Sequence, residues 1–319
     1  MIDKQKSYLV TGGAGFIGSN IVSELLQRGQ RIRVLDNFST GKRENLFPFR
    51  GNPDFELIEG DLRSFHTVRT AVKGIDYILH QGALPSVPRS VEDPLTTNDV
   101  NILGTLNVLE AAKEFGIKRV VYASSSSIYG DSEILPKVET MPVDPLSPYA
   151  LSKYTAERYC QIFSTLYGLE TVCLRYFNVF GPNQDPTSQY SAVIPKFIRL
   201  ICSGNRPTIY GDGAQSRDFT HVSNVVAANL LACTAEDVSG RVFNIACGEG
   251  YTLIQLVEMI NRIAGTKVEP VFAEARPGDV KRSAADIRKA KQKLGFRVLT
   301  RFEQGLAGLI KAMVTQNKR

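Results

Sequence analysis

The first 180 residues alternate short apolar runs with segments of helical periodicity, and this alternation restricts the fold more than any other feature of the chain. The apolar runs predict strands at Tyr8–Thr11, Arg31–Asp36, Phe55–Gly60, Tyr77–His80, Arg119–Ser125 and Thr171–Tyr176. Helical spacing of apolar residues predicts helices at Phe16–Arg28, Asn98–Phe115 and Tyr149–Tyr167. Strands that alternate with helices need crossover connections, so we expect an α/β fold with a doubly wound parallel sheet. Ligands bind such sheets at the carboxyl ends of the strands.

Glycine and proline become frequent beyond Gly181, in the segments GPNQDP, SGNRPTIYGDG and RPGD, and the helical patterns there are short and interrupted. We therefore expect a first domain over residues 1–180 and a smaller α/β region over residues 181–319. The pattern favours a second region that is interleaved with the first and not joined to it by a linker. A chain of this length buries a core without the help of disulfides.

The composition excludes several classes of protein. Hydrophobic residues make up 43% of the chain and charged residues 22%, which is ordinary for a soluble globular protein. No apolar run reaches the ~18 residues of a membrane-spanning helix. The chain starts without the apolar stretch of a secretory signal, so we expect a cytoplasmic protein with no membrane partner.

The distribution of charged residues, cysteines and histidines also disfavours binding of nucleic acids and metal ions. The net charge is +6, but the basic residues are dispersed, which favours a few arginines aimed at small phosphorylated ligands over a nucleic-acid surface. The five cysteines and three histidines show no metal-ligand spacing. We therefore expect no metal site and no disulfide framework.

The segment TGGAGFIG places Gly12, Gly15 and Gly18 at three-residue spacing between the first predicted strand and the first predicted helix. In that position Gly12 permits a tight turn, Gly15 lets the backbone approach a pyrophosphate, and Gly18 lets the helix and strand pack closely. The N-terminus of the helix then presents free N–H groups to the phosphates. The sequence therefore predicts a dinucleotide site.

Asp36 indicates which dinucleotide binds. It ends the second strand, 18 residues after Gly18, where a carboxylate bonds the ribose hydroxyls of NAD and repels the 2′-phosphate of NADP. Arg33, Lys42 and Arg43 lie close to Asp36 in the sequence. We expect NAD, with NADP as the open alternative.

Tyr149 and Lys153 form a Tyr-x-x-x-Lys pair at the start of a predicted helix, on one face of it. A tyrosine with its ordinary pKa near 10 is a poor base at neutral pH. A nearby ammonium and a positive nicotinamide ring would lower that pKa, so we expect Tyr149 to exchange protons with the substrate and Lys153 to activate it. In the serine run 124–127 one hydroxyl could bond the reacting oxygen. We assign this role to Ser125; the alternative for the run is a flexible turn.

Together these motifs resemble the extended short-chain dehydrogenase/reductase family. The resemblance covers nearly the whole chain and lies in TGGAGFIG, Asp36, the serine run before IYG, YALSK, RYFNVFGP, GDGAQSRDFTHV and RPGDVKRSAAD. Within the family the chain is most similar to NAD-dependent nucleotide-sugar 4-epimerases. The resemblance implies a Rossmann domain with tightly held NAD, a small C-terminal substrate domain, and a homodimer formed through the two long helices of the first domain.

The resemblance also implies further binding residues. At the cofactor these are Phe16, Ile17, Asn37, Ser39, Thr40, Gly41, Asp61, Leu62, Gln81 and Ala83. At the nucleotide sugar they are Ser86, Ser126, Ser127, Asn178, Val193, Phe197, Thr208, Tyr210, Arg217, Arg276, Asp279 and Ser283. The residue types agree, because the guanidinium groups of Arg217 and Arg276 suit a pyrophosphate.

Members of the family share one opening step, which here would have Tyr149 take a sugar hydroxyl proton while a hydride leaves C4 for NAD. Ser126 and Ser127 stand where the 4,6-dehydratases of the family carry an Asp-Glu pair, which disfavours dehydration. Members that act on uronic acids carry a basic residue where this chain has Asn183 and Asp185. Arg89 nevertheless keeps a UDP-glucuronic acid 4-epimerase open as the alternative.

We therefore expect 4-epimerisation of a UDP-hexose, by transient oxidation at C4, rotation of the 4-keto sugar and return of the hydride. Ser283 stands where epimerases confined to plain hexoses carry a bulky aromatic residue, and a serine leaves room for a 2-acetamido group. We expect UDP-GlcNAc and UDP-GalNAc as preferred substrates, with UDP-Glc and UDP-Gal also accepted. A packing role for Ser283, an NAD(P)-linked nucleotide-sugar reductase or dehydratase, and a non-catalytic protein that binds NAD(H) or RNA are the alternatives.

Overall fold

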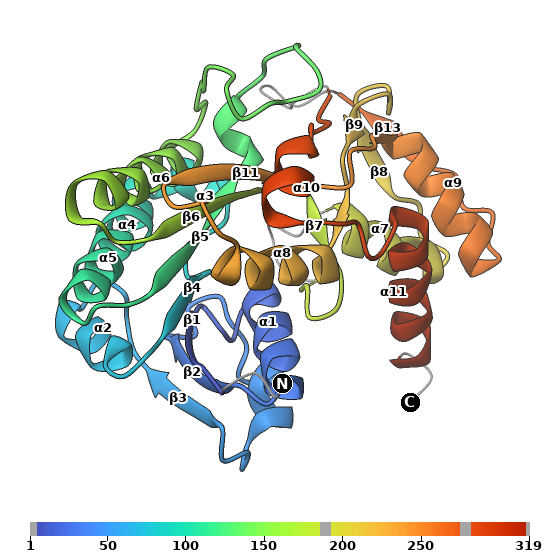
Figure 1. Ribbon diagram of the computed structural model, residues 1–319. Helices are drawn as coiled ribbons and strands as arrows, with labels where there is room; N and C mark the ends of the chain where they lie inside the picture. Colours follow the sequence, from blue (N-terminus) through green and yellow to red (C-terminus); the bar gives the residue numbers. More distant parts are fainter. Residues whose placement is uncertain (1–4, 186–192, 275–281, 317–319) are drawn as a thin grey trace.

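Seven parallel strands form the central sheet, in the order β11-β6-β5-β4-β1-β2-β3 (Figure 1). The computed structural model describes residues 5–185, 193–274 and 282–316. In chain order the strands are β1 Ser7–Thr11, β2 Arg31–Asp36, β3 Phe55–Glu59, β4 Tyr77–His80, β5 Arg119–Ser125, β6 Thr171–Tyr176 and β11 Arg241–Ile245. Every neighbouring pair is parallel, which confirms the expected α/β fold with a doubly wound sheet.

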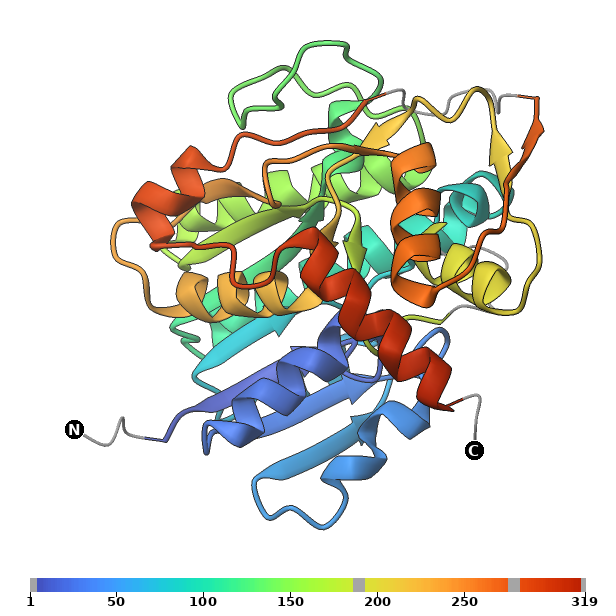
Figure 2. The same ribbon diagram turned by 90° about the vertical axis from the view of Figure 1, so that its right-hand side faces the viewer.

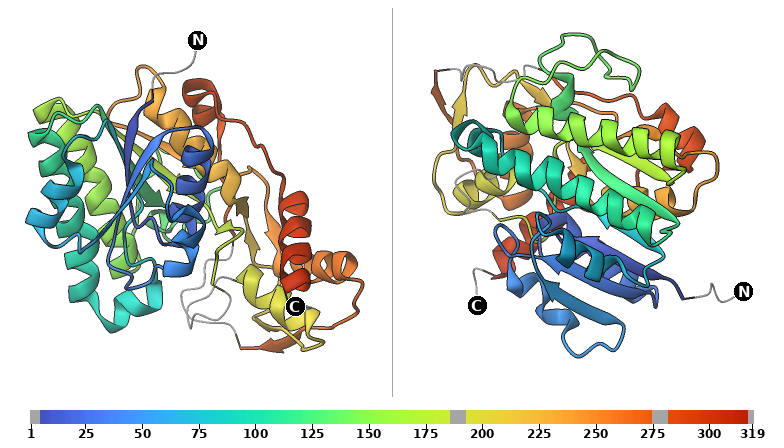
Figure 3. Two further views of the ribbon diagram at one scale, coloured as in Figure 1. Left: turned by 90° about the horizontal axis from the view of Figure 1, so that it is seen from below. Right: turned by 90° about the vertical axis from the view of Figure 1, so that its left-hand side faces the viewer.

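Helices cover both faces of this sheet (Figure 3). One face carries α2 Phe65–Val72, α5 Gly104–Glu114 and α6 Pro148–Tyr167. The other face carries α1 Phe16–Gln27, α8 Val222–Thr234 and α10 Arg288–Leu294. Side chains alternate between the two faces along each strand. In β5, Val120 and Tyr122 pack with α2, α5 and α6, whereas Val121 and Ala123 pack with α1 and α8.

The sequence around Tyr149 explains why helix α6 begins there. Ser147 lies at the N-cap, and its hydroxyl oxygen accepts a hydrogen bond of 3.1 Å from the Ala150 N–H. Pro148 is the first helical residue, a position where its missing N–H leaves no bond unmade. Gly168 ends the helix with a φ of 69°, a left-handed conformation that glycine adopts without strain. Tyr149 therefore lies in the first turn of a helix that is capped at both ends.

The second part of the chain builds a core of its own and also returns to the first (Figure 2). The second core lies among β8 Thr208–Tyr210, α7 Val193–Cys202, α9 Leu253–Ala264 and α11 Phe302–Gln316. The exposed strand β13 Val271–Ala273 pairs with β8 outside this core. At its centre the rings of Phe219 and Phe302 stack with their centroids 5.0 Å apart. Short two-stranded pairings surround it, formed by β7 Val179–Phe180 with β10 Thr220–His221 and by β9 Ser216–Arg217 with β12 Tyr251–Thr252.

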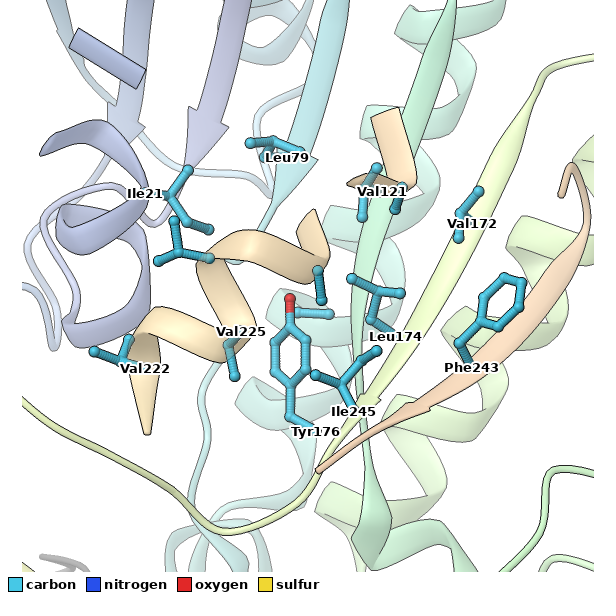
Figure 4. Close-up of a cluster of buried hydrophobic side chains, with 14 of the residues drawn as sticks. Ile21, Leu79, Val121, Val172, Leu174, Tyr176, Val222, Val225, Phe243 and Ile245 are labelled. Atoms are coloured by element: carbon cyan, nitrogen blue, oxygen red, sulfur yellow. The ribbon is translucent and has the colours of Figure 1, made fainter. Parts of the chain in front are cut away.

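Helix α8 and strand β11 belong to the first core although they come late in the chain. Figure 4 shows Val222 and Val225 of α8 over the sheet, in the same cluster as Tyr176 of β6 and Ile245 of β11. Strand β11 pairs with β6 along its whole length. The chain therefore enters the second core after β7, returns to the first for α8 and β11, leaves for α9, returns once more for α10 and ends in the second core with α11. A domain boundary at residue 180 stays a prediction.

One expectation about helices is wrong. The helices beyond Gly181 are not all short, since α8 has 13 residues and α11 has 15, because glycine and proline are concentrated in the loops between them. The helix expected at Asn98–Phe115 is present, but it begins earlier and runs through α4 Pro94–Asn98, a π-helical turn η2 Asp99–Leu103 and α5. Within that turn the side-chain oxygen of Asn101 accepts a hydrogen bond of 2.8 Å from the Leu84 N–H.

The remaining helical turns are η1 Arg43–Phe49, α3 Val87–Glu92 and η3 Ser126–Tyr129, and each follows the carboxyl end of a strand. Within residues 5–185, 193–274 and 282–316, no helix combines the length and the apolar character that crossing a membrane requires.

Candidate active site

A cavity of about 980 Å³ opens at the carboxyl ends of the central strands. Residues from the ends of β1, β2, β4, β5 and β6 line it, together with Arg217 and Ser283 from the second part of the chain. Every residue expected at the cofactor lies in this lining, namely Gly12, Gly15, Phe16, Ile17, Gly18, Asp36, Asn37, Ser39, Thr40, Gly41, Asp61, Leu62, Gln81, Ala83, Tyr149 and Lys153. The fold thus gathers segments from the whole first half of the chain around one space.

The glycine loop leaves no room for side chains. Gly12 has a φ of +67°, and a Cβ there would lie 2.7 Å from the Cα of Gly82. A Cβ on Gly18 would lie 2.1 Å from the carbonyl oxygen of Gly12, so helix α1 packs against the loop only with glycine at this position. Gly15 lies at the N-cap of α1, and the first turn of that helix carries no acidic residue. The first N–H groups of α1 therefore form an anion site that fits a pyrophosphate.

Asp36 is held in place at the end of β2 by two backbone donors. Its Oδ2 accepts a hydrogen bond of 2.9 Å from the Ala14 N–H, and its Oδ1 accepts one of 2.8 Å from the Phe38 N–H. Burial raises the pKa of Asp36, and the two hydrogen bonds oppose that rise. A carboxylate oriented in this way still has lone pairs for ribose hydroxyls, so the site fits the adenosine half of NAD.

Arg33, Lys42 and Arg43 kept NADP as the alternative cofactor, and each of them forms an ion pair with a carboxylate. Arg33 Nε lies 2.7 Å from Glu56, Arg43 Nη2 lies 2.6 Å from Glu59, and Lys42 Nζ lies 2.9 Å from Asp185. These pairs counter the positive charge near Asp36 that would attract a 2′-phosphate. The neighbourhood of Asp36 therefore favours NAD.

Asp61 completes the polar wall on this side of the cavity. Its carboxylate accepts hydrogen bonds from Arg63 Nη2 at 2.8 Å and from Asn37 Nδ2 at 2.9 Å. The hydrogen bond from Arg63 is the main reason that the pKa of Asp61 falls to about 2. The carboxylate is therefore ionised throughout the physiological range and accepts hydrogen bonds from a ligand.

Tyr149 and Ser125 meet at the end of β5. The phenolic hydroxyl of Tyr149 and the side chain of Ser125 line the same cavity, close enough for Ser125 to lower the pKa of the phenol. The Ser125 Oγ also lies 2.8 Å from the Ser127 Oγ. The structure thus places the serine that we assigned to the reacting oxygen against the phenol.

The lowered pKa that we expect for Tyr149 depends on the positive nicotinamide ring, so it stays a prediction. In the protein by itself burial raises this pKa above its ordinary value, and the Ser125 side chain opposes the rise only in part. The physical reason is desolvation, because a phenolate loses its hydration in this pocket. The proton of Tyr149 is therefore retained until further charges or hydrogen-bond donors enter the cavity.

Lys153 lies one helical turn after Tyr149 and is 4% exposed. Its Nζ donates a hydrogen bond of 2.8 Å to the carbonyl oxygen of Ala123 and lies 5.0 Å from the ring of Tyr122. Burial lowers the pKa of Lys153 to about 7. The amine is therefore half charged near neutral pH, and a negative charge close to it would return it to the ammonium form.

The structure brings together only part of the expected substrate set. Ser86, Ser126, Ser127, Asn178, Arg217 and Ser283 line the cavity. Four others lie outside the lining, namely Val193, Phe197, Thr208 and Tyr210. Phe197 and Val193 pack in the second core, and Thr208 and Tyr210 lie on β8. Arg276 and Asp279 lie outside the described residues. A role in substrate binding for any of these residues stays a prediction.

Sequence reasoning missed several residues of the lining, which include Gly82, Tyr129, Lys137, Tyr176, Phe177 and Gln184. Tyr129 lies in the IYG segment, so its place after a strand end could have indicated it. Lys137 had no such signal. It reaches the cavity because its loop pairs in parallel with Ala285, which is 148 residues later in the chain.

The sheet order, the glycine loop and the meeting of Tyr149 with Ser125 define a dinucleotide-binding enzyme of the short-chain dehydrogenase/reductase type. The chain belongs to the NAD dependent epimerase/dehydratase family, whose profile matches residues 8–246. This membership confirms NAD as the cofactor and the extended family that the motifs indicated.

Three known proteins show how far the similarity extends. The structure of the UDP-N-acetylglucosamine 4-epimerase from Methanobrevibacter ruminantium, in complex with UDP-N-acetylmuramic acid, is 41% identical with a TM-score of 0.93, covering 98% of this chain and 99% of that one. The UDP-glucose 4-epimerase of Thermus thermophilus, in complex with NAD, is 38% identical with a TM-score of 0.86, covering 96% and 98%. The UDP-glucuronate 4-epimerase of Thermodesulfobacterium geofontis is 34% identical, covering 94% of this chain and 93% of that protein.

The variant Lys153→Met tests the burial of the lysine. With a folded-state pKa of about 7 against 10.5 for the free side chain, the folded chain binds fewer protons than the unfolded chain in the pH window between these values. Through this group the stability of the wild type rises with pH across that window. The free energy of unfolding of Lys153→Met minus that of the wild type should therefore fall by roughly 1 kcal/mol for each pH unit between about pH 7 and about pH 10.

Urea unfolding of both proteins at several pH values measures this difference. The variant also loses the hydrogen bond to Ala123, which lowers its stability by the same amount at each pH above about 7. The change of the stability difference with pH is therefore the quantity that tests the account, and its size at any one pH is not. A stability difference that does not change with pH would contradict the account of Lys153.

Proposed function

We propose that the protein is an NAD-dependent 4-epimerase of UDP-hexoses. The observation that carries the proposal is that Tyr149, Ser125 and Lys153 line one cavity together with the glycine loop and Asp36. This arrangement places a proton acceptor and a hydroxyl donor beside a cradle for NAD. The similar proteins named above, which are 4-epimerases of three different UDP-sugars, support the same reaction.

In the proposed reaction Tyr149 takes the proton of the sugar 4-hydroxyl, and Ser125 donates a hydrogen bond to the same oxygen as it becomes a carbonyl. NAD held by the glycine loop and Asp36 would supply the acceptor for the C4 hydride and the donor for its return to the other face of the 4-keto sugar. Lys153 gains its full charge as the phenolate forms, because the negative charge offsets the desolvation of the ammonium. Tyr149 takes the sugar proton as a phenolate, which forms when the neutral amine of Lys153 takes up the proton of the phenol. Tyr149 returns the sugar proton after the second hydride transfer, so the phenolate that begins each turnover is also the form that ends it.

Two neighbouring residues support epimerisation over dehydration. Ser126 and Ser127 line the cavity directly after Ser125. Dehydration across C5 and C6 needs a general acid and a general base at such positions, and hydroxyl groups near neutral pH serve as neither. An NAD(P)-linked reductase would consume reduced cofactor in stoichiometric amounts, which separates it from an epimerase.

Among the UDP-hexoses we favour UDP-GlcNAc and UDP-GalNAc, with UDP-Glc and UDP-Gal also accepted. Ser283 is 8% exposed and lines the cavity together with Arg217, and its small side chain leaves space for an acetamido group. The similarity to the UDP-N-acetylglucosamine 4-epimerase of Methanobrevibacter ruminantium supports this preference. In this reading Arg217 would hold the diphosphate and Asn178 the neighbouring part of the nucleotide sugar.

UDP-glucuronic acid is the second candidate substrate, on a separate observation. Arg89 lines the cavity beside Ser86 and Val87, and a guanidinium group there suits a sugar carboxylate. The UDP-glucuronate 4-epimerase of Thermodesulfobacterium geofontis, which is similar over nearly the whole chain, points the same way.

We also propose that the protein forms a homodimer through α5 and α6, which lie side by side on the outside of the sheet (Figure 3). Leu103, Leu151, Ile162 and Leu166 of this region have exposed side chains, and Leu166 is 69% exposed. Such a stripe of apolar side chains is typical of a protein interface. A cytoplasmic location stays a prediction.

The double variant Leu151→Glu/Leu166→Glu should convert the dimer to a monomer in sedimentation experiments, because it places charges in the interface core. Phe272→Glu is the matched control, since Phe272 is 54% exposed on β13 in the second part of the chain. It should leave the dimer unchanged. A monomeric wild type at micromolar concentration would overturn the proposed dimer.

Incubation of the purified protein with UDP-GlcNAc, UDP-Glc or UDP-GlcA, without added cofactor, tests the proposed function. NMR should detect the C4 epimer of UDP-GlcNAc at the highest rate. Tyr149→Phe should lower turnover by about 100-fold or more while nucleotide affinity stays near the wild-type value. Products without inversion at C4, or full activity of Tyr149→Phe, would refute the proposal.

Ser283→Tyr tests the assignment of the preferred substrate. The aromatic ring would fill the space beside Arg217, so activity on UDP-GlcNAc should fall about 10-fold or more while activity on UDP-Glc stays within about 3-fold. Ser283→Ala, which keeps the space, should retain both activities. Equal losses on the two substrates in Ser283→Tyr would remove the argument from pocket size.

A further inference from the structure

A buried ion pair lies directly behind the serine run. Glu157 of α6 and Arg175 of β6 are 1% and 4% exposed. Arg175 donates two hydrogen bonds to the carboxylate of Glu157, from Nη2 at 2.6 Å and from Nε at 3.0 Å. Neither residue lines the cavity, so the pair does not contact a ligand there. A charged pair in such a dry place is costly to form, which calls for an explanation beyond packing.

The pair is connected to the end of β5. The hydroxyl of Ser124 donates a hydrogen bond of 2.6 Å to Glu157 Oε2. Ser124 and Arg175 are direct partners across β5 and β6, so Glu157 binds both members of one cross-strand pair. Ser125, the next residue along β5, lines the cavity with Tyr149 and lowers the pKa of its phenol.

The pair is also connected to helix α6 and to the cavity wall. Tyr149, Lys153 and Glu157 follow one another at intervals of four residues and so lie on one face of α6. Arg175 Nη1 donates a hydrogen bond of 2.7 Å to the hydroxyl of Tyr129, which lines the cavity. That hydroxyl donates in turn to Asn244 Oδ1 at 2.7 Å.

Arg175 stays positively charged although it is buried. Burial works against it, but the hydrogen bonds and the charge of Glu157 outweigh burial, and the pKa of Arg175 lies above its ordinary value. Any rotation or sliding of α6 would therefore break charged hydrogen bonds in a place where water cannot replace them.

We infer that Glu157 and Arg175 are positioning residues, which fix the rotation of α6 against β5 so that Tyr149 and Ser125 meet at one oxygen of the substrate. The inference deepens the proposed function and rests on it for the identity of the reaction. An interaction between side chains on two different elements depends on the relative placement of those elements. Glu157 holds this placement two helical turns from Tyr149, where it leaves the cavity itself free for ligands.

Arg119 offers a matched control on the same sheet. It lies at the start of β5, is 7% exposed, and pairs with Glu170 at the opposite edge of the sheet. Lysine at either position keeps the positive charge but loses the planar two-pronged geometry. Arg175→Lys and Arg119→Lys should therefore both lower the melting temperature.

Kinetics separate the two variants. Arg175→Lys should lower kcat about 10- to 100-fold with KM for the UDP-sugar within about 3-fold, because a small misplacement of reacting groups is costly whereas the diphosphate contacts are intact. Arg119→Lys should keep the kcat and KM of the wild type. Equal losses of kcat in the two variants would overturn the inference.

The double variant Glu157→Met/Arg175→Met distinguishes positioning from stability. Apolar side chains of similar volume often replace a buried ion pair without loss of stability, so this variant should fold. Its kcat should stay low, because Ser124 loses its acceptor and Tyr129 loses the hydrogen bond from Arg175. A double variant that recovers both stability and kcat would show that the pair serves only the fold.

A readout without substrate keeps this inference apart from the proposed function. The phenol of Tyr149 can be titrated by ultraviolet difference spectra of each protein against the same protein carrying Tyr149→Phe. Since the Ser125 side chain lowers the pKa of this phenol, Arg175→Lys should raise that pKa by about 0.5 to 1 pH unit and Arg119→Lys should not. If the wild type failed to epimerise any UDP-sugar, the proposed function would fall, while an unchanged titration in Arg175→Lys would overturn the positioning role.

Discussion

The buried amine of Lys153 is the group on which the chemistry of the site depends. Desolvation lowers the pKa of Lys153 to about 7 and raises the pKa of Tyr149, so burial favours the neutral form of both side chains. The ion pair of phenolate and ammonium becomes favourable only when both charges are present together, because each then offsets the desolvation of the other. Proton transfer is in this way coupled to the filling of the cavity.

The topology explains how a chain of this length assembles such a site. The carboxyl ends of the parallel strands bring Gly12, Asp36, Gln81 and Ser125 to one edge, and the second part of the chain approaches the same edge with Arg217 and Ser283. Because α8 and β11 belong to the first core, the second part is anchored to the sheet from within. Both walls of the cavity are thereby fixed to the same sheet. This suits a reaction in which cofactor and sugar must stay in position through two hydride transfers.

Much of the first half could be predicted from the sequence. The strands β2, β4, β5 and β6 have the predicted boundaries, because their apolar runs end sharply at polar residues or turns. The glycine loop and Asp36 could be predicted for a related reason, since glycines and carboxylates at strand ends act through local geometry. The other residues expected at the cofactor came from the family resemblance, and their contact with NAD stays a prediction. The π-helical turn at Asp99–Leu103 was not accessible, because it depends on a hydrogen bond between the Asn101 side chain and the distant backbone of Leu84.

The electrostatics of the site were the hardest part to predict. The spacing of Tyr149 and Lys153 is visible in the sequence, but the direction of their pKa shifts depends on how much water reaches them, and only the packed structure shows that. The same holds for Glu157 and Arg175, which look like ordinary charged residues in the sequence and are buried in the fold. Lys137 reaches the cavity through a pairing with Ala285 that no local pattern could indicate.

The most direct test of the account follows the hydrogen atom at C4 of the sugar. UDP-GlcNAc that carries deuterium at C4 should give UDP-GalNAc in which the deuterium is still at C4, in ordinary water and without added cofactor, because the hydride leaves and returns within one closed site. Proton NMR of the product measures this retention. Replacement of the deuterium by hydrogen from the solvent would contradict the account, since it would mean that inversion at C4 proceeds by proton exchange and not by hydride transfer.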